Sequence, residues 1–150
     1  MKLAEALQER ADLNTKLEQL RTRLQSNALV QEGEQPAESP EELLTELDAC
    51  TARLQELMFR INKTNCITVD DGVTITELIA LKDTLNLRIR AYRELITCAS
   101  ATARRAMHSE IKVLSTVNVR ELQKQVDAMS KQLRETDNRI QALNWNTELL

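Results

Sequence analysis

The sequence predicts a mainly α-helical fold: four long helices in a bundle or coiled-coil arrangement, with a small β-hairpin at one end. Chain breakers are scarce, since the 150 residues include only two glycines and two prolines. Charged residues make up 29% of the chain and aromatic residues only 2%, a composition typical of long helices. Apolar residues, mostly leucine, recur every three or four positions over four segments, which is the period of a helix with one packed face.

The first helix is expected over about residues 2–26. Its apolar positions follow steps of three and four residues, with Arg10 as the polar break: Leu3, Ala6, Leu13, Leu17, Leu20 and Leu24. Such a narrow stripe is typical of helices packed side by side. Residues 30–39 are acidic and contain Gly33 and Pro36, so they are expected to form an exposed connection.

The second helix is expected over about residues 40–65. Ser39 can accept a hydrogen bond from the backbone N–H of Glu42, and the Glu42 carboxylate can accept one from Ser39, which would form a capping box. Pro40 suits the first helical position, where a missing N–H costs nothing. The apolar stripe that follows consists of Leu43, Leu47, Cys50, Leu54, Leu57 and Ile61.

A β-hairpin is expected over about residues 66–74. β-branched residues flank the sequence Asp70-Asp71-Gly72, in which Gly72 can supply a positive φ. An isolated pair of strands is only marginally stable. Residues 111–117 are also rich in β-branched side chains and are a possible third strand of this sheet.

The third helix is expected over about residues 75–104, starting at a capping box of Thr74 and Glu77. It carries two apolar stripes, although a helix with one buried face needs only one. The first stripe consists of Leu78, Leu81, Leu85, Ile89, Tyr92, Ile96 and Ala99. The second contains no charged residue: Ala80, Thr84, Leu87, Ala91, Leu95, Cys98 and Thr102. We therefore expect a second subunit to cover it, with Ala80, Leu87 and Ala91 as the candidate oligomer face.

The fourth helix is expected over about residues 119–143, with Asn118 and Glu121 at its start. Its stripe is the most regular in the chain: Val119, Leu122, Val126, Met129, Leu133, Thr136, Ile140 and Leu143. Residues 1–150 are long enough to bury a sizeable core, and we predict that they form one helical-bundle domain.

Acidic and basic residues are unevenly distributed along the chain, whose formal net charge is −3. Between Gln25 and Ala52 there is no Lys or Arg, and the acidic residues there include Glu41, Glu42, Glu46 and Asp48. Between Lys82 and Lys112 basic residues predominate. We interpret these segments as complementary surfaces, either within one fold or between subunits.

Several features predict a soluble protein of the cytoplasm. The first residues lack the apolar segment of a signal peptide, and no window reaches the ~18 apolar residues of a membrane span. The three cysteines form no CxxC pair, so we expect small buried side chains in a reducing compartment.

The sequence contains no recognisable catalytic or metal-binding pattern. His108 is the only histidine, and no cysteine or carboxylate pair accompanies it. There is no HExxH, GxSxG or phosphate-binding glycine loop. We therefore predict that the chain is not an enzyme and that it carries no metal or cofactor.

Two polar clusters are candidate binding surfaces. One lies before the hairpin and the other at the end of the chain, and together they give a candidate ligand or partner surface of Arg60, Asn62, Asn65, Asn144, Trp145, Asn146 and Glu148. The same side chains could instead cap helix ends and lock a turn. A basic group, Arg104, Arg105 and Lys112, is a candidate anion-binding site, but no aromatic platform for nucleic-acid bases accompanies it.

Five segments, spread over nearly the whole chain, carry a resemblance: MKLAEALQERADL, VQEGEQPAESPEELL, RINKTN, SEIKVLSTVNVRELQKQ and NWNTELL. Together they resemble the septicolysin-like family of small bacterial proteins. The resemblance implies an all-helical fold with a small β element, and the family's name implies a cytolysin. It supplies no active-site residues.

We predict that this chain is a homo-oligomeric assembly or interaction module without catalytic activity, whose partner is a second copy of itself. One alternative is a septicolysin-like cytolysin that acts on membranes. The other is binding of RNA or of a phosphate ligand through Arg104, Arg105 and Lys112.

Overall fold

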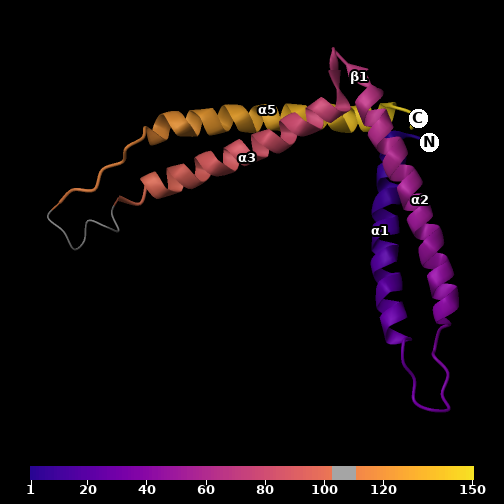
Figure 1. The fold of residues 1–150 in the computed structure, drawn as a ribbon. Helices are drawn as coiled ribbons and strands as arrows, with labels where there is room; N and C mark the ends of the chain where they lie inside the picture. The colour runs from indigo at the N-terminus through magenta and orange to yellow at the C-terminus, as the bar shows by residue number, and fades with distance from the viewer. Residues whose placement is uncertain (103–110) are drawn as a thin grey trace. The chain divides into compact units, whose positions relative to one another are not determined.

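The computed structural model describes residues 1–102 and 111–150 (Figure 1). This part contains four long helices and one two-stranded antiparallel sheet, which confirms the mainly α-helical fold with a small hairpin. The helices are α1 (Leu3–Ser26), α2 (Pro40–Ile67), α3 (Ile75–Ala99) and α5 (Val119–Asn146), and the strands are β1 (Val69–Asp70) and β2 (Val73–Thr74).

The chain divides into two compact units. One comprises Met1–Asp70 together with Leu143–Leu150, and the other comprises Asp71–Ala142. The boundaries fall inside the hairpin turn and near the end of α5. The single domain expected over residues 1–150 stays a prediction.

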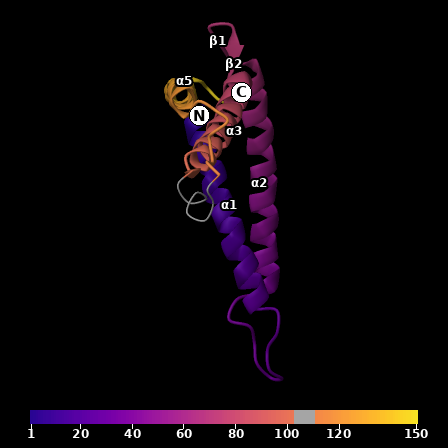
Figure 2. The same cartoon turned by 90° about the vertical axis from the view of Figure 1, so that its left-hand side faces the viewer.

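In the first unit, α1 and α2 lie side by side and run in opposite directions (Figures 1 and 2). The expected leucine stripes face each other, since Leu20, Leu43 and Cys50 form one buried cluster. Partly buried leucines pack against this cluster: Leu13, Leu17, Leu24 and Leu47. Burial of these stripes accounts for the pairing, because removing apolar surface from water contributes about 25 cal/mol per Å².

The connection between α1 and α2 is held at both ends by side chains. Asn27 follows α1 and accepts a hydrogen bond at Oδ1 from the backbone N–H of Glu38, at 3.0 Å. Arg23 also forms an ion pair with Glu38. At the start of α2, Ser39 Oγ accepts from the N–H of Glu42 at 3.4 Å, but the structure shows no return bond from Ser39 to the Glu42 carboxylate. Only half of the expected capping box therefore forms.

The hairpin turn uses two left-handed residues where the sequence predicted one. Asp71 has φ 47° and Gly72 has φ 76°. Positive φ at both central residues is the geometry of the tight turns whose twist matches paired strands. Thr74 then starts α3: its Oγ1 accepts from the N–H of Glu77 at 3.2 Å, and the Glu77 carboxylate accepts from the N–H of Thr74 at 2.7 Å. The capping box expected here is confirmed.

The prediction of a possible third strand over residues 111–117 is wrong. These residues form no strand, and within residues 1–102 and 111–150 the sheet consists of β1 and β2. Ser115 supplies the physical reason, because its Oγ donates to the Val117 carbonyl at 2.8 Å and accepts from the Val117 N–H at 3.3 Å. Such local side-chain bonds occupy the backbone groups that a strand needs for its ladder.

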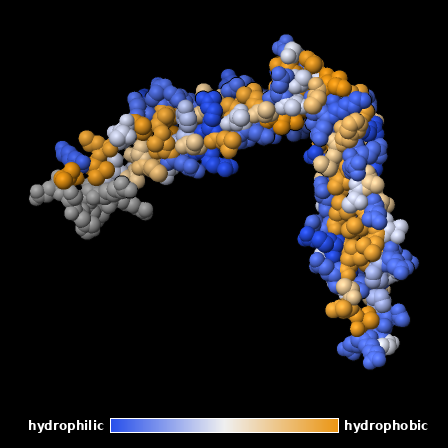
Figure 3. All heavy atoms as spheres, viewed as in Figure 1, coloured by the Kyte–Doolittle hydropathy of each residue, from blue (hydrophilic) through white to orange (hydrophobic). Residues whose placement is uncertain are grey.

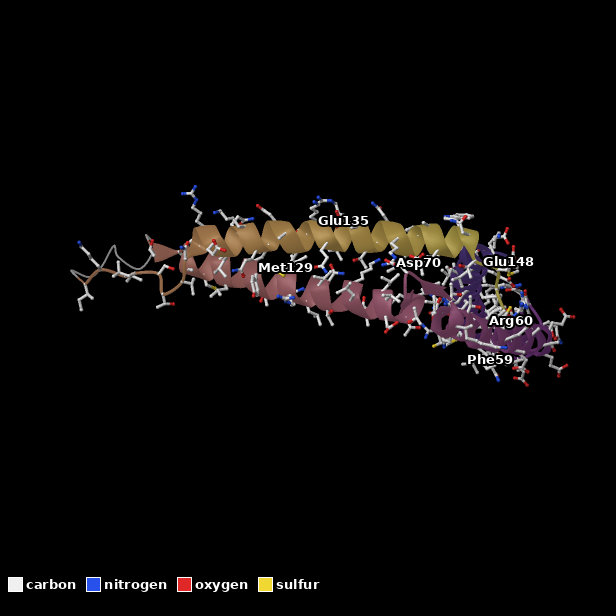
Figure 4. The ribbon with its side chains drawn as sticks, turned by 90° about the horizontal axis from the view of Figure 1, so that it is seen from above. Phe59, Arg60, Asp70, Met129, Glu135 and Glu148 are labelled. Atoms are coloured by element: carbon white, nitrogen blue, oxygen red, sulfur yellow. The ribbon has the colours of Figure 1, made fainter. Side chains whose placement is uncertain are left out.

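In the second unit, α3 and α5 lie side by side in two views (Figures 1 and 4). Their buried cluster consists of Leu85, Ile89, Val126 and Met129 (Met129 is labelled in Figure 4). Tyr92, Ile96 and Leu133 pack against this cluster. These residues belong to the first stripe of α3 and to the stripe of α5, so the sequence correctly identified the two facing surfaces.

Three helix ends and two cysteines differ from expectation. α3 ends at Ala99, before the expected residue 104, because the N–H of Ala101 bonds to the Cys98 carbonyl three residues back and tightens the last turn. α2 and α5 are longer than expected, ending at Ile67 and Asn146. Cys50 is buried as expected, whereas Cys66 and Cys98 are exposed.

Candidate functional site

Arg60 and Thr64 of α2 hold the last residues of the chain. They are four residues apart and so lie on the same side of the helix. Arg60 Nε donates to the carbonyl of Leu150 at 2.8 Å, and its Nη2 donates to the carbonyl of Leu149 at 3.4 Å. Thr64 Oγ1 accepts from the N–H of Leu150 at 3.0 Å and donates to the Arg60 carbonyl at 2.8 Å. Both hydrogen-bonding capacities of the fully buried Thr64 hydroxyl are therefore used.

A short antiparallel bridge pairs Lys2 with Glu148 in the same unit. The backbone N–H of Leu3 donates to the Thr147 carbonyl, and the N–H of Leu149 donates to the Met1 carbonyl, each at 2.9 Å. Lys2 Nζ lies 2.8 Å from Glu148 Oε1, and the amino group of Met1 lies 3.2 Å from Glu148 Oε2. Residues 147–150 are therefore bound by hydrogen bonds and ion pairs to the start of α1 on one side, and by hydrogen bonds to α2 on the other.

The electrostatics of this segment centre on Glu148, which lies near Arg60 in Figure 4. The hydrogen bond from Lys2, followed by the one from the Met1 amino group, lowers the pKa of the Glu148 carboxyl below its ordinary value. The Glu148 side chain is nonetheless 63% exposed. Solvent therefore screens both ion pairs, and they contribute less than the buried hydrogen bonds of Thr64.

The structure brings together only part of the expected ligand or partner surface. Arg60 and Glu148 contact the segment at residues 147–150 and the start of the chain, as described above. Asn144 is buried, and the Asn146 carbonyl accepts from Lys2 Nζ at 3.2 Å. Asn62 and Trp145 are exposed, and Asn65 is partly buried. These contacts agree with the alternative that the polar residues secure helix ends, and a ligand role for the set stays a prediction.

The structure describes Lys112 of the candidate anion-binding site but neither of its two arginines. Arg104 and Arg105 lie outside the described residues, as does His108. Lys112 is described and is exposed.

The candidate oligomer face lies on the outer side of α3. Ala80, Leu87 and Ala91 are all exposed, and 61% of Leu87 is accessible to solvent. Leu85 and Ile89, on the opposite side of the same helix, are buried against α5. Figure 3 shows apolar residues at the surface of this unit among the polar ones.

Sequence reasoning missed the two ion pairs that join α1 to α2, which are Lys16 with Glu46 and Arg53 with Glu9. Arg53 Nε lies 2.7 Å from Glu9 Oε1, and its Nη2 lies 3.0 Å from Glu9 Oε2, so the two groups meet in a two-pronged geometry. The Glu9 carboxylate raises the pKa of Arg53, and the guanidinium lowers the pKa of Glu9. Glu9 precedes Arg10, the polar residue that interrupts the apolar stripe of α1. That interruption was the only sequence signal for a polar contact between α1 and α2 at this level.

Neither metal-binding clusters nor membrane-spanning helices occur in the described residues. No group of three or more His, Cys, Asp or Glu side chains within residues 1–102 and 111–150 could hold a metal ion. None of the helices described combines the length and apolarity needed to cross a membrane.

The described fold and its contacts define a class of protein: two helical hairpins linked by a short β-hairpin, with the last residues bound to the first and second helices. The chain belongs to DUF6847, a family of unknown function whose model matches residues 10–149. It is similar to a crystal structure described as a functionally unknown conserved protein from Corynebacterium diphtheriae. The TM-score is 0.91 and the identity 40%, over 100% of this chain and 99% of that one. No curated protein matches the sequence.

Neither the family match nor the similar crystal structure bears on the resemblance to septicolysin-like proteins. That resemblance, and the cytolysin that its name implies, stay predictions.

Proposed function

We propose that this protein is an assembly module whose copies associate through the outer face of α3, and that it acts by binding and not by catalysis. The observation that supports this proposal is the exposure of the second apolar stripe. Leu87 is 61% exposed and Leu95 is 42% exposed, with Ala80 and Ala91 exposed on the same side.

An ordinary surface helix does not carry a second, exposed apolar stripe of this kind. An amphipathic helix turns charged and polar side chains to water opposite its buried face. The second stripe of α3 carries no Lys, Arg, Asp or Glu and consists of Ala80, Thr84, Leu87, Ala91, Leu95 and Cys98. The exposed Asp83 and Glu94 lie beside it. Contiguous exposed apolar surface of this kind marks interaction sites in soluble proteins. Covering it with a second subunit would remove that surface from water.

Measurement of mass in solution tests the proposal. We expect light scattering or sedimentation velocity to show a species larger than the monomer in the micromolar range. The variant Leu87→Glu places a charge in the centre of the stripe and should shift the protein to the monomer. The matched control Leu29→Glu makes the same change at a residue that is 89% exposed in the connection between α1 and α2, and it should leave the mass unchanged. A wild-type protein that is monomeric at every concentration would overturn the proposal.

A further inference from the structure

The tail of the chain, residues Leu143–Leu150, belongs to the first compact unit, although the rest of α5 belongs to the second. The backbone therefore passes between the two units at two places. One is Asp70–Asp71 in the hairpin, and the other is Ala142–Leu143 in α5. Any change in which the tail leaves residues 1–70 must therefore bend or open the chain at one of these crossings.

The two crossings differ in stiffness. α5 is a continuous helix from Val119 to Asn146, and no turn or loop interrupts it at Ala142. The hairpin crossing is a tight turn of two residues, Asp71 and Gly72, between β1 and β2. When this turn opens, the second unit and the tail can move away from residues 1–70 together.

The closed turn carries a conformational cost that its opening removes. Asp71 has φ 47°, in the left-handed region, which costs free energy for Asp and more for a β-branched residue. Asp71 and Gly72 are both exposed, and nothing lies within 4 Å of the position that a Cβ on Gly72 would occupy. Side-chain packing therefore contributes little to holding the turn closed. Short hinge loops under strain favour domain swapping, in which two copies exchange an identical segment.

The groups that bind the tail would bind the tail of another copy equally well. Arg60 and Thr64 bind its backbone on one side, and Lys2 pairs with it on the other. Leu149 contributes a side chain that is only 8% exposed. All of these contacts join residues 1–70 to residues 143–150, and a second copy presents the identical set. Exchange of tails between two copies therefore keeps every one of them.

We propose that two copies of this chain exchange tails, so that residues 1–70 of each copy hold Leu143–Leu150 of the other, with the turn at Asp71–Gly72 as the hinge. The partner is a second copy of the chain, and its tail completes the bridge to Lys2 and the contact with Thr64. Such swapping is a low-cost route to a dimer, because the contacts of the monomer are reused. The inference goes beyond the proposed function, since it does not involve the exposed stripe of α3.

Protein concentration decides between the closed and the exchanged form. A tail on the same chain competes at an effective concentration of the order of millimolar. The closed form should therefore persist at the micromolar concentrations at which association through α3 is measured. Exchange should occur when the chain refolds at about 1 mM. It should then reverse slowly, because the turn and the tail contacts must all open.

Cross-linking at the bridge tests the exchange. Lys2 and Glu148 face each other between two backbone hydrogen bonds that their neighbours make. In such a non-hydrogen-bonded pair the Cα atoms are about 4.5 Å apart, a separation that a disulfide can span. Lys2→Cys and Glu148→Cys are made as separate variants in a chain whose own cysteines are replaced by alanine: Cys50, Cys66 and Cys98. After an equimolar mixture refolds at about 1 mM and is oxidised, we expect a disulfide that joins position 2 of one variant to position 148 of the other, identified by mass spectrometry.

Three controls separate exchange from chance contact. The same mixture refolded at micromolar concentration should give several-fold less of the cross-link. Glu32→Cys in place of Lys2→Cys puts the thiol on an exposed residue of the connection between α1 and α2, and it should give no cross-link above background. A chain with both Lys2→Cys and Glu148→Cys should form the disulfide within the monomer at micromolar concentration. If that chain closes and the mixture at about 1 mM gives no cross-link, the proposal is wrong.

Substitutions at the hinge give an independent test. Asp71→Gly removes the cost of a positive φ and should lower the proportion of exchanged dimer several-fold, whereas Asp71→Val raises that cost and should increase the proportion. Equal proportions in the two variants would overturn the proposal.

One further variant separates the exchange from association through α3. Leu87→Glu should leave the cross-link unchanged, because the exchange does not use the exposed stripe. Loss of the cross-link in Leu87→Glu would mean that the α3 stripe brought the chains together, and the exchange would then be wrong. A wild type that is monomeric at micromolar concentration overturns association through α3 but agrees with an exchange that needs about 1 mM.

Discussion

The hydroxyl of Thr64 accepts a hydrogen bond from the backbone N–H of Leu150 at 3.0 Å, across 86 residues of sequence. The same hydroxyl donates to the carbonyl of Arg60, whose guanidinium binds the carbonyls of Leu149 and Leu150. Two side chains on one turn of α2 thus satisfy three backbone groups of a segment that has no regular secondary structure of its own. A buried polar group left without such a partner would cost free energy.

Replacement of Thr64 should weaken this attachment. Thr64→Val keeps the shape of the side chain and removes the acceptor for the Leu150 N–H, so we expect a loss of about 1 kcal/mol in the free energy of unfolding. Urea denaturation measures the loss. Thr45→Val is the control, since Thr45 is exposed and its hydroxyl only donates to the Glu41 carbonyl one turn back. Equal losses in the two variants would show that the Leu150 contact contributes nothing.

The ion pairs of Glu148 should make stability depend on pH. Because Lys2 and the Met1 amino group lower the folded-state pKa of Glu148 below its ordinary 4.5, the contribution is present above that value and is lost as the pH falls through the folded-state pKa. Glu148→Gln should therefore be less stable than the wild type at neutral pH, and the difference should shrink in acid. Denaturant midpoints at several pH values test this.

A matched variant controls for the removal of any carboxylate. Glu32→Gln changes an exposed residue that forms no ion pair within the described residues, and it should produce no such pH-dependent difference. A difference for Glu148→Gln that is constant across the acid range would argue against the assigned ion pairs.

The capping box of α3 should contribute measurably to stability. Thr74→Ala removes the acceptor for the Glu77 N–H and should cost about 1 kcal/mol of unfolding free energy. Thr74→Ser keeps a hydroxyl in place and should recover most of that loss. If serine recovers nothing, the loss arises from side-chain packing and not from the hydrogen bond.

Two leucines of α3, two residues apart, should respond differently to truncation. Leu85 is 2% exposed in the core of the second unit, so Leu85→Ala should cost about 2–5 kcal/mol. Leu87 is 61% exposed, and Leu87→Ala should change stability by less than about 0.5 kcal/mol when measured at a concentration at which the protein is monomeric. Similar losses at both positions would mean that α3 buries its second stripe within the monomer, which would also remove the basis of the proposed function.

The sequence predicted the helices well because each of them carries a signal that is local. The stripe of α3 through Leu85 and Ile89 identified its buried face, and the box of Thr74 and Glu77 identified its first turn. The prediction of a third strand failed because β-branched composition does not reveal which hydrogen bonds the backbone groups form. Ser115 bonds to Val117 locally, and that contact competes with strand pairing.

The contacts of the candidate site were harder to predict. Arg60 belongs to a polar cluster that the sequence shows before the hairpin, but periodicity carries no information about a partner 89 or 90 residues away. The same limit applies to Arg53 and Glu9, which are 44 residues apart. Cys66 and Cys98 show a related limit, since a residue type that is usually buried can also lie on the outer face of a helix.

The backbone bridge between Lys2 and Glu148 has a topological consequence. Because the Leu149 N–H reaches the Met1 carbonyl at 2.9 Å, a short flexible linker could connect these two ends without moving either. New ends could then be opened at Gly33, which is exposed and has nothing within 4 Å of the position that a Cβ would occupy. Such a circularly permuted chain would keep the same helices in a different sequence order, but it would lose the charged Met1 amino group that pairs with Glu148.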